Sequence, residues 1–132
     1  MFNPILEENT IWFLRKSELN YDRTVVQSPG FYRFTYRISD SRPASSVVES
    51  ALALLLRRNI QQILGKFSPD GILNTSQLLN APIGAALYPL NPAPPFFTVV
   101  TDLGDVHSMW FNSAPDRFFV ASPWVKAKAL SC

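Results

Sequence analysis

His107 is the one histidine of the chain and the residue with the widest chemical use. It lies in the stretch TDLGDVHSMWF, with Asp102 and Asp105 before it and Ser108 directly after it. Serine, histidine and aspartate are the residue types of a nucleophilic triad. However, neighbouring residues of a strand point to opposite faces, and the sequence has no nucleophile-elbow pattern. We therefore interpret His107 as a surface or half-buried residue at the start of a hairpin strand.

Other chemistry finds less support. One histidine and one cysteine, Cys132, cannot supply a structural zinc site. The five glycines are isolated from one another, so no glycine-rich phosphate loop is present. Paired carboxylates placed for acid–base work are also absent. The sequence thus predicts no catalytic residue, no metal ligand and no cofactor, and a protein that is not an enzyme.

Basic side chains offer a different use, as contacts for a polyanion or an acidic protein surface. The candidate residues for such contacts are Arg33, Arg37, Arg42, Arg57 and Arg58. In residues 31–38, Tyr, Phe and Ile alternate with Arg, Thr and Ser, which predicts a half-buried antiparallel strand. The aromatic side chains share the core face, so only the arginine face of this strand is left for a nucleic acid.

A long helix follows. Ser46 and Glu49 have the spacing of a capping box, Pro43 fits an extended entry, and Gly65 fits the position just past the end. We expect a helix over about 46–65 whose apolar surface is too wide for one buried face. The candidate interface residues are Leu52, Leu55 and Leu56 on this helix, with Trp110 and Trp124 farther along the chain.

The second half begins with a proline-rich connection at 82–97, which is expected to be neither regular helix nor central strand. Strands are then expected over 95–102, 106–112 and 117–122 as an antiparallel meander, followed by a short helix over 123–130 that Pro123 begins. The predicted fold class is α+β, with the long central helix packed on a mostly antiparallel sheet and a C-terminal three-stranded meander.

Composition sets the wider limits. At 132 residues, 47% of them hydrophobic, the chain is predicted to be a single globular domain over 1–132. Residues 31–66 carry six Lys and Arg against two acidic residues, and residues 67–116 carry four Asp and no Lys or Arg. Opposed charge blocks and surplus apolar surface indicate docking on another protein or on a second copy. The predicted function is a non-enzymatic adaptor or scaffold protein that associates with itself as a homodimer.

Nucleic-acid binding is the alternative function, through the arginine face of 31–38 and the Arg57/Arg58 pair. The N-terminus lacks the basic and apolar regions of a signal peptide, and the run ALALLL is too short to span a bilayer. We therefore expect a soluble, intracellular protein, cytoplasmic or associated with a virion.

The expected association with a virion rests on a local sequence resemblance. The stretch FYRFTYRISDSRPASSVVESALALLLR resembles the strand-then-helix segment of vesiculovirus matrix proteins, with the match centred on Arg42, Pro43 and the Ser-Ser-Val-Val-Glu run at 45–49. It covers about a fifth of the chain. The resemblance implies a viral or phage structural accessory protein.

Overall fold

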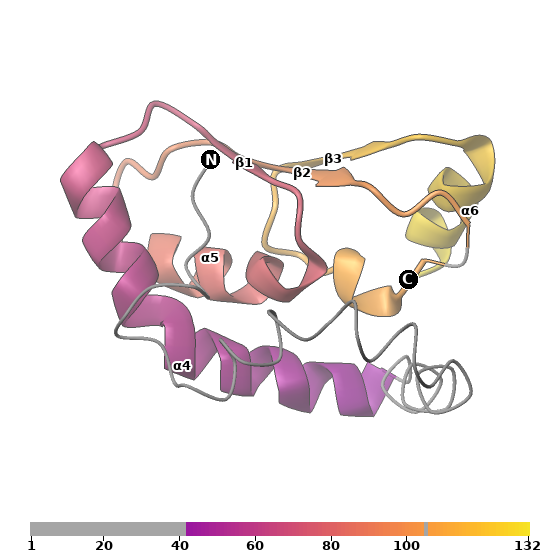
Figure 1. Ribbon diagram of the computed structural model, residues 1–132, viewed down its shortest axis with the longest axis horizontal. Coiled ribbons are helices and arrows are strands. Elements are labelled where there is room, and N and C mark those ends of the chain that lie inside the picture. The colour runs from indigo at the N-terminus through magenta and orange to yellow at the C-terminus, as the bar shows by residue number, and fades with distance from the viewer. Residues whose placement is uncertain (1–41, 105) are drawn as a thin grey trace, which may run out of the picture.

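The computed structural model describes residues 42–104 and 106–132. The predicted strand over 31–38, with Arg33 and Arg37, lies outside these residues. Figure 1 shows the described elements as a small sheet with helices beside it. The helices are α4 (Arg42–Phe67), α5 (Asn80–Leu87) and α6 (Pro123–Ser131), the strands are β1 (Ile72–Asn74), β2 (Phe96–Val100) and β3 (Arg117–Val120), and two short 3-10 helices are η1 (Gln77–Leu79) and η2 (Ser108–Trp110).

The sheet is parallel, which contradicts the predicted antiparallel sheet and meander. Its strand order is β1-β2-β3, with Ile72 opposite Phe96 and Phe97 opposite Arg117. Residues 106–112 do not form the expected middle strand, because Ser108–Trp110 winds into η2 and carries the chain back across the sheet. A crossover of this kind joins parallel strands, whereas a tight turn joins antiparallel ones. The architecture is therefore α/β in this part of the chain, not α+β.

A helix does occupy the expected middle of the chain, but its neighbours differ from the prediction. Among the described elements, α4 packs mainly against α5, which lies between α4 and the sheet (Figure 1). Leu52, Leu56 and Ile60 of α4 enter a core that also holds Ile83 of α5 and Phe96 of β2. The long helix is thus an outer layer over α5.

The start of α4 also lies earlier than the capping-box interpretation placed it. The helix begins at Arg42, so Pro43 stands in its first turn, and Ser46 and Glu49 are interior positions. Proline fits the first turn, because its missing amide hydrogen would have no intrahelical partner there. Ser46 instead offers its backbone carbonyl to the hydroxyl of Ser50 at 2.8 Å.

The proline-rich connection is helical in its first part, contrary to expectation. Pro82 is the third residue of α5, still within the turn whose amides have no intrahelical acceptor. Residues 88–95 then lead to β2 without regular structure. The predicted short final helix is confirmed as α6, which Pro123 begins and which the Ser122 hydroxyl caps by accepting from the Val125 amide at 3.2 Å. That the whole chain is one domain stays a prediction.

Candidate site at the carboxyl ends of the strands

Polar side chains gather where the three parallel strands end. Asn74 is the last residue of β1, Asp102 and His107 follow β2, and Ser122 follows β3. In open parallel sheets, ligands bind in the crevice outside the carboxyl ends of the strands. We therefore take these loops, and the residues that hold them, as the candidate functional site.

A buried amide network holds the floor of this site. Asn80, the first residue of α5, accepts from the Thr98 hydroxyl at 2.6 Å and from the Asn74 side-chain amide at 2.7 Å. Its own amide nitrogen donates to the backbone carbonyl of Trp110 at 2.8 Å. The three asparagine and threonine side chains are all buried, so their hydrogen bonds are formed away from water, where leaving one unmade is expensive.

His107 is buried at the site, with 3% of its surface exposed. Its Nδ1 accepts a hydrogen bond from the backbone amide of Met109 at 3.1 Å, so the imidazole caps η2. A nitrogen that accepts a hydrogen bond carries no proton, and the neutral ring then holds its proton on Nε2. In this arrangement His107 is a hydrogen-bond donor at Nε2 and not a proton acceptor there.

The Ser–His–Asp interpretation receives no support from the geometry. The carboxylate of Asp102 accepts from the indole nitrogen of Trp110 at 2.7 Å, which ties it to an aromatic side chain. Asp105 is outside the described residues. Ser108 begins η2 and follows its neighbour His107 in the turn.

The five candidate interface residues divide by burial. Leu52, Leu56 and Trp110 are buried in the described part of the chain, so they belong to its core. Leu55 is 46% exposed and Trp124 is 70% exposed, so these two remain available to a partner. Val47 and Leu54, which sequence analysis did not single out as interface residues, are exposed on the same helix as Leu55.

The arginine candidates that the structure describes all lie on α4. Arg57 and Arg58 are exposed, and Arg42 is the first residue of the helix. None of the three follows a strand: Arg42 begins α4, and Arg57 and Arg58 are interior positions of the same helix. Their use as contacts for a polyanion stays a prediction.

Sequence reasoning missed Asn74, Thr98 and Asn80. These side chains are amides and a hydroxyl, and the bonds join positions separated by 6 and 18 residues. One signal could have identified Asn74: it directly follows the apolar residues Ile72 and Leu73. That signal is useful only if the strands are known to be parallel.

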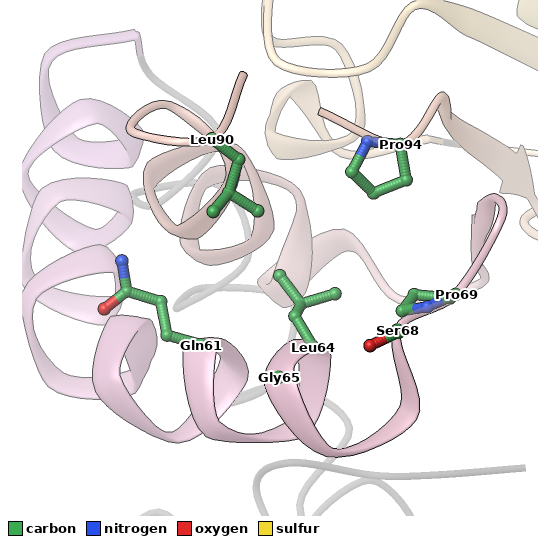
Figure 2. Close-up of a pocket in the computed structure, with 7 residues that line it drawn as sticks. All are labelled: Gln61, Leu64, Gly65, Ser68, Pro69, Leu90 and Pro94. Carbon is green, nitrogen blue, oxygen red and sulfur yellow. The ribbon is translucent and has the colours of Figure 1, made fainter. Parts of the chain in front are cut away.

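A cavity of about 400 Å³ opens between the end of α4 and the segments that lead into β1 and β2, and Figure 2 shows the residues that line it. Leu64, Leu90 and Pro94 form apolar walls, and Gln61 and Ser68 add polar atoms. Pro94 precedes β2, so this cavity faces the amino ends of the strands. Among the described residues, its lining includes no acidic, basic or histidine side chain, so these residues supply none of the groups that acid–base chemistry needs.

The described residues show neither a cluster of metal ligands nor a helix suited to cross a bilayer. Within 42–104 and 106–132, no three His, Cys, Asp or Glu side chains come together as a metal site would require. In the same part of the chain, none of the helices combines the length and the hydropathy that crossing a bilayer demands.

The parallel strands define the class as an α/β protein, and the polar groups at their carboxyl ends make that edge the candidate ligand site. Residues 4–132 match the model of the family "Monogalactosyldiacylglycerol (MGDG) synthase", and the chain belongs to this family. The family therefore extends over nearly all of the sequence, including the residues that the structure does not describe.

Individual relatives agree with this membership. The chain is 27% identical over 132 residues to "Monogalactosyldiacylglycerol synthase 3, chloroplastic" of Arabidopsis thaliana, covering 98% of this chain and 28% of that protein. It is 25% identical over 121 residues to "Probable monogalactosyldiacylglycerol synthase 2, chloroplastic" of Oryza sativa subsp. indica, covering 90% of this chain and 26% of the relative. The chain thus spans about a quarter of the length of these curated relatives. No solved structure matches it.

Family membership corrects the predicted function. The expectation of a non-enzymatic adaptor or scaffold protein is wrong, as is the expectation that the chain is not an enzyme, because the family and the relatives are synthases. The viral or phage structural assignment is wrong for the same reason, and nucleic-acid binding is withdrawn as the alternative function. A capping-type run before an apolar helix carried the viral resemblance, and such a run is too short to identify a family.

Proposed function

We propose that this chain forms part of a glycosyltransferase that attaches galactose to diacylglycerol. The match of residues 4–132 to the MGDG synthase family carries the proposal. In such a transfer, the acceptor hydroxyl forms a bond to the anomeric carbon of the sugar. The bond from that carbon to the leaving group of the donor breaks, and the hydroxyl proton is released.

The carboxyl edge of the sheet is the part of the transfer site that this chain supplies. Support comes from Asp102 and His107, which follow β2 and are held there by Trp110 and Met109. Polar groups fixed before the substrate arrives stabilise developing charge without reorganising during the reaction. The imidazole of His107 is placed at this edge by the bond to its Nδ1, and it is the side chain whose loss should impair transfer.

The test is a transfer assay on the full-length protein. Radiolabelled UDP-galactose is incubated with the protein and diacylglycerol in mixed micelles, and the lipid fraction is separated. Label in a monogalactosyl lipid, dependent on diacylglycerol, is the expected result. A folded protein that leaves the label in the aqueous fraction would overturn the proposal.

A matched pair of variants locates the site. His107→Asn keeps a side-chain oxygen to accept from the Met109 amide, because asparagine is a good capping residue, but it removes the Nε2 donor. We expect it to fold and to lose transfer. Tyr88→Ser, at an exposed position in the loop between α5 and β2, serves as the control and should transfer normally. Full activity in His107→Asn would exclude His107 from the reaction.

Two earlier expectations stay open beside this proposal. The predictions that the chain associates with itself or binds a nucleic acid concern its partners, and membership in the family does not test them. The expected cytoplasmic location is likewise a prediction, and the chloroplast in the names of the relatives belongs to those proteins.

A further inference from the structure

Asn80 is a fully enclosed polar side chain near the carboxyl edge of the sheet, with 0% of its surface exposed. It stands at the first position of α5, where the helix enters the core from η1. All of its side-chain atoms have partners, since it is absent from the buried groups that lack them. A buried amide with every bond formed specifies one arrangement of the elements it joins.

The bonds of Asn80 join three elements that are distant in the sequence. Asn74 ends β1 and Thr98 lies in β2, and these two residues face each other as neighbours in the register of the sheet. Both donate to the same oxygen of Asn80. The amide nitrogen points the other way, to the carbonyl of Trp110 at the end of η2. Asn80 therefore ties η2 to the two strands.

The turn that follows β2 is short and forms few backbone hydrogen bonds within itself. A 3-10 helix of three residues makes few internal bonds, here Trp110 amide to His107 carbonyl at 3.1 Å and Phe111 amide to Ser108 carbonyl at 2.9 Å. The bond from the Met109 amide to His107 Nδ1 belongs to the same turn. The Trp110 carbonyl and the imidazole thus belong to one short turn, and fixing the first restrains the second.

We propose that Asn80 is a positioning residue for His107. Its amide fixes the carbonyl of Trp110, the fixed carbonyl keeps η2 wound, and the wound turn presents the Met109 amide to Nδ1, so that the imidazole proton stays on Nε2. The role of this imidazole in transfer rests on the proposed function, whereas its tautomer and its dependence on Asn80 do not.

The chain offers an unambiguous reporter, because His107 is its one histidine. Long-range ¹H–¹⁵N NMR of the imidazole separates a ring with its proton on Nε2 from a ring that exchanges between both tautomers. Asn80→Ser keeps a hydroxyl near Thr98 and Asn74 but is too short to reach the Trp110 carbonyl. We expect wild type to show a single Nε2–H tautomer and Asn80→Ser to show a mixture.

Thr98→Val is the matched control. It removes the hydroxyl bond to Asn80 with almost no change of shape, and it leaves the bond between Asn80 and Trp110 in place. We expect Thr98→Val to lose stability and keep the wild-type imidazole signals. A second variant, Asn80→Asp, keeps the oxygen acceptor and serves if Asn80→Ser does not fold. Wild-type signals in a folded Asn80 variant, or an equal mixture in Thr98→Val, would overturn the positioning role.

Transfer kinetics give the second measurement. A loosened imidazole should lower kcat by about tenfold to a hundredfold with KM nearly unchanged, because small misplacement of a reacting group costs rate more than binding. Tyr88→Ser, at an exposed position away from this network, should keep kcat within about threefold of wild type. A tautomer mixture with normal kcat would refute the link from Asn80 to the reaction. Absence of transfer in wild type, with the NMR result as expected, would refute the proposed function alone.

Discussion

The carboxylate of Asp102 accepts a hydrogen bond from the indole nitrogen of Trp110 across 2.7 Å. Asp102 follows the end of β2, and Trp110 closes η2, so the bond ties the two ends of the loop together. Trp110 is also held at its backbone carbonyl by Asn80. Trp110 is thus held both at its ring and at its main chain. His107 lies in the loop between Asp102 and Trp110.

Removing the acceptor of this bond should destabilise the fold. In Asp102→Ala the indole nitrogen of a buried tryptophan is left without its carboxylate partner, which should cost about 1–3 kcal/mol of unfolding free energy. Asp102→Asn keeps an oxygen at the same place and should cost roughly half as much, because a neutral acceptor makes a weaker bond. Urea unfolding measures both. An unfolding free energy of Asp102→Ala equal to that of wild type would show that the bond contributes nothing.

The direction of the strands was the main property that sequence did not reveal. Period-two patterning finds a strand but does not say which way its neighbour runs. Val106, His107, Met109 and Trp110 are all buried, which a strand with one exposed face cannot achieve and a 3-10 turn inside the core can. Once residues 106–112 were taken as a strand, an antiparallel meander followed from the short connections.

The helices were easier to predict, because the sequence signals of a helix come from residues close together in the chain. Pro123 at the start of α6 and the apolar run of α4 were both read from adjacent residues. The candidate site was not, because hydrogen bonds of Asn80 reach positions 6, 18 and 30 residues away. Amide and hydroxyl side chains form no motif along the sequence, so only the folded chain brings them together.

Glu49 gives the described part of the chain a dependence on pH. Burial disfavours the charged carboxylate and raises the pKa of Glu49 above its ordinary 4.5. The folded state then holds the proton more tightly than the unfolded state, so stability falls as the pH rises from about 4.5 through the raised pKa. Glu49→Gln should therefore be slightly more stable than wild type at pH 7.

The control for this prediction is the same pair of proteins at low pH. Below pH 4.5 the carboxyl is protonated in both states, and the stabilising effect of Glu49→Gln should vanish. The melting temperatures of the two proteins between pH 3.5 and 7.5 decide the matter. A difference that stays constant over this range would exclude burial of the carboxylate as its cause.

Leu52 and Leu55 separate the core of α4 from its exposed side. Leu52 is 6% exposed and packs in the core, so Leu52→Asp buries an unpaired carboxylate and should abolish the cooperative unfolding transition. Leu55→Asp places the same charge on an exposed side chain and should change the unfolding free energy by less than about 1 kcal/mol. Circular dichroism with thermal melting distinguishes the two.

The same exposed position tests self-association. If two copies meet through α4, wild type should sediment as a dimer at micromolar concentration, and Leu55→Asp should sediment as a monomer with a normal melting curve. Leu130→Asp, at an exposed position on α6, is the matched control and should leave the dimer intact. A monomeric wild type would remove the homodimer prediction.

Gly84 allows α5 to approach the loop before β3. A Cβ added at Gly84 would lie 2.5 Å from the Cβ of Ala114, closer than two such carbon atoms approach without displacement. Gly84→Ala should therefore cost about 1–3 kcal/mol through overpacking, partly offset by about 1 kcal/mol of improved helix propensity. Ala114→Gly in the same chain removes the clash. The double variant should recover most of the loss, with a coupling energy of at least about 1 kcal/mol between the two sites.

Gly65 is the matched control for this pair, because it also lies within a helix, α4, but has nothing within 4 Å of an added Cβ. Gly65→Ala gains helix propensity without a clash and should stabilise the chain by up to about 1 kcal/mol. Opposite signs for Gly84→Ala and Gly65→Ala in urea unfolding would attribute the cost at position 84 to Ala114. If both substitutions stabilise the chain, then α5 can move away from the loop, and the close approach at Gly84 does not constrain the fold.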